Sequence, residues 1–79
     1  MTRVVDRRDP RWSDPLWRTE TFLALCADYQ LSVGEVSAYT EKSFETVMQW
    51  RSGRSRVIPT PLLRLMMLEL ALGGRNALA

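Results

Sequence analysis

The segment between Pro61 and Gly73 constrains this chain most, because it is apolar along almost its whole length. Between those two residues only Arg64 and Glu69 are polar. A helix on a protein surface normally carries one apolar stripe, whereas this one would be apolar nearly all round. The longer apolar stretch 58–72, which also holds Pro59 and Pro61, is too short and too interrupted by charge and proline to span a bilayer. A helix here must therefore be covered by protein on two sides.

Two arrangements can supply that cover. The chain has 79 residues, which suits one small domain with a small core. Either the rest of the domain covers one side and a second copy covers the other, or the helix is buried wholly within its own domain. Cyclic dimers are the commonest oligomers, so the first arrangement is favoured and predicts a homodimer. Its predicted interface consists of Leu62, Leu63, Leu65, Met66, Met67 and Leu70.

Two helices are predicted in the first half of the chain. Asp14 followed by Pro15 is typical of an N-cap and a first-turn proline, and apolar spacing then predicts a helix over 15–29. Ser32 and Glu35 have the spacing of a capping box, in which each side chain bonds to the other residue's backbone amide. A short helix over 33–39 follows from it.

Two more helices follow, and no segment has a credible strand pattern. Ser43 is predicted to cap a helix over 44–52, which Gly53 ends in a left-handed conformation. Thr60 and the proline after it are predicted to be the N-cap and first-turn proline of the last helix, which runs to about Leu72. The expected fold is all-α, with four helices.

The ends of the chain are predicted to lie outside the domain. Residues 1–14 lack periodicity and are basic, so they are expected to form an extended or partly disordered arm. The domain is placed at 15–74, with a C-terminal tail at 75–79. The arm either tracks nucleic acid through Arg3, Arg7 and Arg8 or is a solubilising tail.

Composition argues against an enzyme. Histidine is absent, and there is no glycine-rich phosphate loop or paired-carboxylate spacing. The single cysteine, Cys26, lies among apolar residues and is interpreted as a small buried hydrophobe. No cofactor, metal or small-molecule substrate is predicted. The charged N-terminus lacks a signal-peptide pattern, so a cytoplasmic location is expected.

The stretch 31–54, LSVGEVSAYTEKSFETVMQWRSGR, has an ordered set of features. They are a Leu31-Ser32 start, Ser37 midway along a helix, a turn at 40–42, Ser43, Thr46-Val47, Trp50 and Gly53-Arg54. This set resembles the helix-turn-helix of Cro/cI-type (Xre-like) regulators. At the turn position where that family usually has glycine, this chain has Glu41, which is therefore expected to adopt a strained backbone.

A second resemblance concerns the end of the chain. The short length, the Ile58-Pro-Thr-Pro61 link and the apolar ending Leu68-Glu-Leu-Ala71 resemble the small anti-CRISPR-associated (Aca) repressors. Those phage proteins bind inverted repeats as dimers and repress their own operon. The resemblance implies that the last helix makes the dimer contact.

A helix-turn-helix offers its second helix to the DNA major groove. Val47 and Trp50 are expected to face the core, which leaves the opposite face to read bases. Glutamine can pair with adenine, glutamate can accept from cytosine, and a phenyl ring can touch a thymine methyl group. The predicted base-reading residues are Phe44, Glu45, Met48 and Gln49. The alternative is that Glu45 is merely solvated and that Phe44 and Met48 are packing residues.

Positive charge is concentrated directly after this helix. The run Arg51-Ser-Gly-Arg-Ser-Arg56 is either a solvated loop or a set of phosphate contacts, which supply affinity without sequence information. The predicted DNA-backbone residues are Lys42, Ser43, Thr46, Arg51, Arg54, Arg56 and Arg8.

The sequence predicts a sequence-specific transcriptional repressor, and an autorepressor in particular. It is expected to bind an inverted repeat in double-stranded DNA as a homodimer, in a bacterial or phage-infected cell. The alternative is a helical protein-interaction module or antitoxin-like adaptor, in which the apolar last helix grips another protein.

Overall fold

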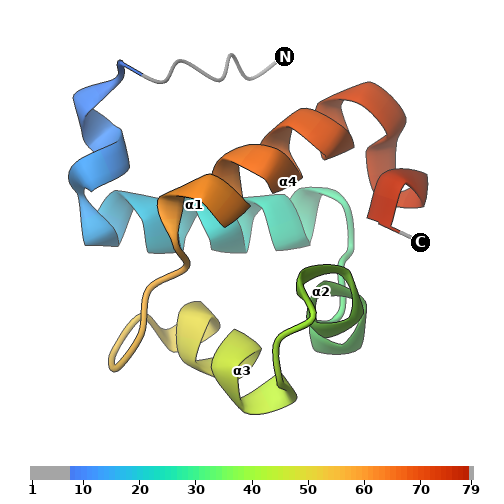
Figure 1. The fold of residues 1–79 in the computed structure, drawn as a ribbon, viewed down its shortest axis with the longest axis horizontal. Helices are drawn as coiled ribbons and strands as arrows, with labels where there is room; N and C mark the ends of the chain where they lie inside the picture. Colours follow the sequence, from blue (N-terminus) through green and yellow to red (C-terminus); the bar gives the residue numbers. More distant parts are fainter. Residues whose placement is uncertain (1–7, 79) are drawn as a thin grey trace.

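The computed structural model describes residues 8–78, and every described element is helical. The order is η1 (Pro10–Ser13), α1 (Pro15–Asp28), α2 (Val33–Thr40), α3 (Phe44–Ser52), α4 (Thr60–Gly73) and η2 (Gly74–Leu78). In Figure 1, α4 crosses α1, while α2 and α3 lie together on one side of this pair. The all-α, four-helix prediction is confirmed. Within 8–78, no helix is long and apolar enough to cross a membrane.

Three of the predicted helix starts are confirmed. The Asp14 carboxylate accepts a hydrogen bond from the Leu16 amide at 3.0 Å. The Ser32 hydroxyl accepts from the Glu35 amide at 3.1 Å, and the Glu35 carboxylate accepts from the Ser32 amide at 3.0 Å, so the capping box is complete. At α3, the Ser43 hydroxyl accepts a hydrogen bond from the Thr46 amide at 3.2 Å.

The predicted start of the last helix is wrong by one residue. Pro59 is the N-cap of α4, Thr60 is already helical, and no side chain caps this end. The Thr60 hydroxyl instead donates to the Trp12 carbonyl oxygen at 3.2 Å. A distant acceptor thus competes successfully for the hydroxyl that the local sequence pattern assigns to the cap.

The core gathers residues from every helix. Phe22 lies at its centre, fully buried, and its ring meets Trp50 edge to face with the ring centroids 6.1 Å apart. Cys26 is buried as predicted, and burial raises the pKa of its thiol. The core residues are Trp12, Phe22, Leu25, Cys26, Leu31, Val36, Val47, Trp50, Ile58, Leu63, Met66, Met67, Leu70 and Leu78.

The predicted N-terminal arm is wrong for its described part. Trp12 in η1 is only 7% exposed, and its ring meets Trp17 edge to face at a centroid distance of 4.9 Å. Its carbonyl oxygen accepts from the Arg18 guanidinium at 2.6 Å as well as from Thr60. One large indole anchors a segment without any periodic pattern, so periodicity does not detect it. Arg3 and Arg7 lie outside the described residues.

The predicted C-terminal tail is also part of the domain. Leu78 at the end of η2 is buried. The Arg75 guanidinium makes two hydrogen bonds to the Glu35 carboxylate, at 2.9 and 2.8 Å, and so joins η2 to the start of α2. The domain therefore extends beyond the predicted 15–74 at both ends.

Glu41, between α2 and α3, has the left-handed backbone that its position in the turn predicts, with φ 59° and ψ 28°. A left-handed residue with a Cβ costs about 1–2 kcal/mol. We expect Glu41→Gly to raise the free energy of unfolding by up to about 1 kcal/mol, since glycine's larger unfolded-state entropy offsets part of the gain. Urea denaturation measures it. The control is Glu45→Gly, which introduces glycine at a helical residue of α3. This substitution is expected to lower the free energy of unfolding by about 1 kcal/mol.

Candidate nucleic-acid interface

The turn between α2 and α3 is held by hydrogen bonds from both sides. The Thr40 hydroxyl donates to the Val36 carbonyl oxygen at 2.8 Å, and the Ser37 hydroxyl donates to the Lys42 carbonyl oxygen. Val36 and Val47 are buried between the two helices. These contacts fix the angle at which α3 leaves α2.

The C-terminal end of α3 is pressed against α1. Gly53 ends the helix with φ 69°, and a Cβ atom there would lie 2.8 Å from the Thr19 methyl carbon. Only glycine fits this approach without displacing Thr19, which is itself buried. Together with the Trp50–Phe22 contact, this orients α3 so that one face is buried and the other is presented to solvent.

The outward face of α3 carries three of the four predicted base-reading residues. Phe44 is 62% exposed, Met48 is 55% exposed, and Glu45 is exposed as well. Gln49 is partly buried. The alternative that Phe44 and Met48 are core packing residues is wrong, although the tip of the Phe44 ring does approach Gly34 of α2.

The predicted DNA-backbone residues around α3 are mostly exposed to solvent. Lys42, Ser43, Arg51, Arg54 and Arg56 are exposed, and Thr46 is partly buried. The Ser43 hydroxyl is engaged as the α3 cap.

Arg8 is exposed, but η1, which closely follows it, lies on the far side of α1 from α3 in Figure 1. The structure therefore brings together all of the predicted backbone residues except Arg8.

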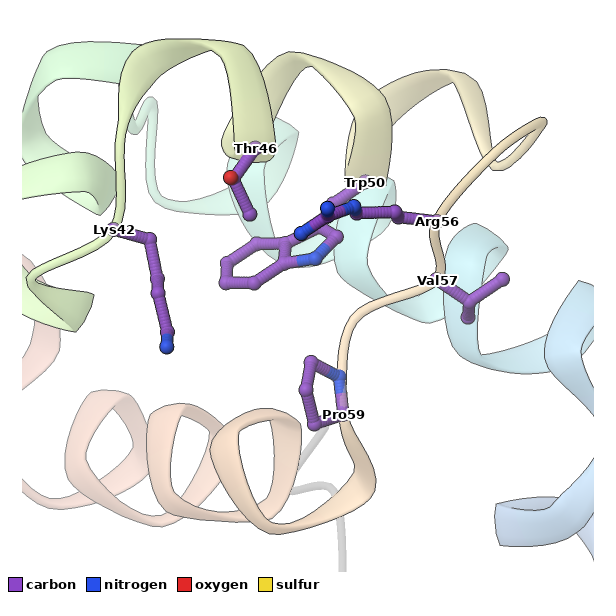
Figure 2. A pocket seen from close by; sticks show the side chains of 6 residues that line it. All are labelled: Lys42, Thr46, Trp50, Arg56, Val57 and Pro59. Atoms are coloured by element: carbon purple, nitrogen blue, oxygen red, sulfur yellow. The ribbon is translucent and has the colours of Figure 1, made fainter.

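Three of the predicted DNA-backbone residues, Lys42, Thr46 and Arg56, also line a pocket that the sequence does not reveal. Its volume is about 270 Å³, and it lies between α3 and the loop 53–59. Figure 2 shows Lys42, Thr46 and Trp50 on one wall, with Arg56 reaching from the loop toward the indole ring. The remaining lining residues are Val57 and Pro59. Thr46 and Trp50 are four residues apart on α3 and so share a helical face, whereas Lys42 lies in the turn before the helix.

Two titratable groups of α2 have shifted pKa values. Hydrogen bonding to the Ser32 backbone, and then to Arg75, lowers the pKa of Glu35. Burial, together with the nearby Glu69 carboxylate, raises the pKa of Tyr39 to about 12. At neutral pH Glu35 is therefore ionised and Tyr39 is protonated. Neither group changes its protonation state near neutral pH, so the charge of α2 stays constant there.

The predicted dimer interface on α4 is wrong at four of its positions. Leu63, Met66, Met67 and Leu70 are buried within their own domain, whereas Leu62 is partly buried and Leu65 is exposed. The large apolar residues of α4 that are exposed are Leu65, Leu68 and Leu72, which we call the α4 stripe. Their spacing of three and four places them on one face. A nearly all-apolar helix has no pattern to show which side turns inward.

Comparisons of this chain with protein-family models, with curated proteins and with solved structures found no match.

Proposed function

We propose that this protein is a sequence-specific DNA-binding repressor that acts as a homodimer on an inverted repeat and controls its own gene. The observation that carries the proposal is the exposed face of α3, held rigidly by packing on its other face and flanked by arginines. A helix presented in this way fits the DNA major groove, and cations beside it can contact the phosphates.

The exposed α3 residues suit base contacts of different kinds. Phe44 and Met48 offer apolar surface to thymine methyl groups, and the Glu45 carboxylate can accept a hydrogen bond from the cytosine amino group. Gln49 is partly buried, so it contributes at the edge of the contact. Arg51 lies in the last turn of α3 and Arg54 just beyond it, where both would contact the DNA phosphates.

The α4 stripe supports the dimer. Full burial of one leucine side chain is worth roughly 1.5–3 kcal/mol, so three exposed leucines on each subunit suffice for a stable association. Two copies related by a two-fold axis would present two α3 helices to successive turns of DNA, about 34–36 Å apart. Such a dimer reads an inverted repeat.

Salt dependence tests the DNA contacts. Four cations per subunit, Lys42, Arg51, Arg54 and Arg56, make eight per dimer and predict a slope of log affinity against log salt of about −7. Arg54→Ala is expected to make that slope shallower by about two units and to weaken binding to all sequences alike. Arg8→Ala, on the far side of α1, is the matched control and should leave the slope unchanged. An affinity that does not depend on salt contradicts the proposal.

One observation favours a second function, a protein-interaction module. Phe44 and Met48 form an exposed apolar pair one turn apart, with the acidic Glu41 and Glu45 beside them. An apolar, acidic surface of this kind also suits a basic protein partner. Selection of binding sites from random DNA separates the two functions: a repressor enriches one inverted repeat, and Glu45→Ala changes the preferred base, whereas an interaction module enriches no sequence.

A further inference from the structure

The Trp50 side chain has a hydrogen-bond donor, the indole N–H, without a partner among residues 8–78. Trp50 is only 2% exposed, and among residues 8–78 no acceptor lies within hydrogen-bonding distance of its indole N–H. Buried indole N–H groups usually have an acceptor. Figure 2 shows the indole nitrogen on the edge of the ring nearest Pro59, inside the pocket described above. Among the described residues the only fully buried side-chain polar atom without a partner is the Tyr39 hydroxyl, so the Trp50 indole N–H is open to the pocket and available to an acceptor that enters it.

The other polar groups that line the pocket are also donors. Lys42 contributes an ammonium group and Arg56 a guanidinium, and within 8–78 neither has an ion-pair partner. The Thr46 hydroxyl oxygen accepts from the Ser43 hydroxyl at 3.0 Å, which leaves its own proton free to donate. None of the lining residues is acidic. The pocket is thus lined by four donors, two of them cationic, and by no carboxylate.

We propose that this pocket binds a phosphate group. A phosphate offers several acceptor oxygens and negative charge, which match the four donors in both number and sign. Val57 and Pro59 supply apolar walls for the carbon side of a phosphate ester. The volume of about 270 Å³ is close to the lower end of small-molecule sites, so it accommodates a phosphate with a small organic group.

The phosphate can come from two sources. One is the DNA backbone, since Lys42 lies just before the helix that we place in the major groove and Thr46 lies in its first turn; this source rests on the proposed function. The other is a small phosphate ester in solution, which would occupy the same donors and so compete with DNA. The second source does not depend on DNA binding.

Phenyl phosphate tests the free source. The protein is labelled with ¹⁵N and titrated while the Trp50 indole N–H resonance is followed, with benzyl alcohol as an uncharged probe. We expect a saturable shift with phenyl phosphate and none with benzyl alcohol. Lys42→Met and Arg56→Met should each weaken binding at least about tenfold, because each removes a charge-assisted contact. Arg51→Met is the matched control, since it removes an equal charge from α3 outside the pocket, and it should weaken binding less than about twofold.

A DNA titration with the same four proteins separates the sources. If DNA shifts the Trp50 indole resonance, and Lys42→Met and Arg56→Met lose more DNA affinity than Arg51→Met, the pocket takes a backbone phosphate. If phenyl phosphate saturates the pocket but no protein binds DNA, the pocket stands and the proposed function fails. The inference is overturned if neither ligand moves the Trp50 resonance, or if Arg51→Met loses as much affinity for phenyl phosphate as the pocket variants do.

Discussion

Met66→Asp is expected to unfold the protein. Met66 is fully buried on the inward face of α4, so the substitution removes core packing and places an unpaired carboxylate in an apolar site. The loss of packing alone costs about 2–5 kcal/mol, and burial of the charge adds to it, against a total stability of about 5–15 kcal/mol for a small domain. Circular dichroism should show the loss of most helical signal at 25 °C.

Leu68→Asp is the matched variant on the same helix. Leu68 is 47% exposed and lies in the α4 stripe, so its carboxylate stays hydrated in the monomer. We expect this variant to keep its helical signal but to dissociate to monomers in light scattering, with most affinity for an inverted repeat lost. A folded, monomeric Met66→Asp protein would show instead that Met66 faces the partner. A Leu68→Asp protein that remains a dimer would rule out the α4 stripe as the interface.

Trp12→Ala is expected to have the second largest effect, a loss of about 3–5 kcal/mol in the free energy of unfolding. The indole fills the space between Trp17 and the start of α4, where the Arg64 guanidinium lies 5.7 Å from its ring centroid. Without this ring the segment has little to keep the Trp12 carbonyl oxygen in reach of Arg18 and Thr60. Urea denaturation measures the loss.

The control for Trp12→Ala is Leu16→Ala. Leu16 is also apolar and lies in the first turn of α1, but it is exposed. Its replacement is expected to change stability by less than about 0.5 kcal/mol. Equal effects of the two substitutions would mean that the N-terminal segment is the loose arm that its lack of periodicity predicts.

The sequence by itself determined the local structure at most helix ends. The caps at Asp14, Ser32 and Ser43, and the left-handed residues Glu41 and Gly53, depend on atoms a few residues apart. The starts of α1, α2 and α3, the end of α3 and the turn between α2 and α3 could therefore be predicted. The outward face of α3 followed too, because Val47 and Trp50 mark its buried side in the sequence.

Tertiary contacts decided the rest. The direction in which α4 turns its apolar surface depends on where α1 and η2 lie, because leucines and methionines occur on every side of that helix. Trp12 and Leu78 are each the one buried residue of a short 3-10 helix, so no periodic pattern indicates that they belong to the core. The pocket beside Trp50 exists only because Arg56 and Pro59, in the loop 53–59, fold back onto α3. Periodicity records which side of a helix is apolar, but it carries no information about which distant segment comes to cover it.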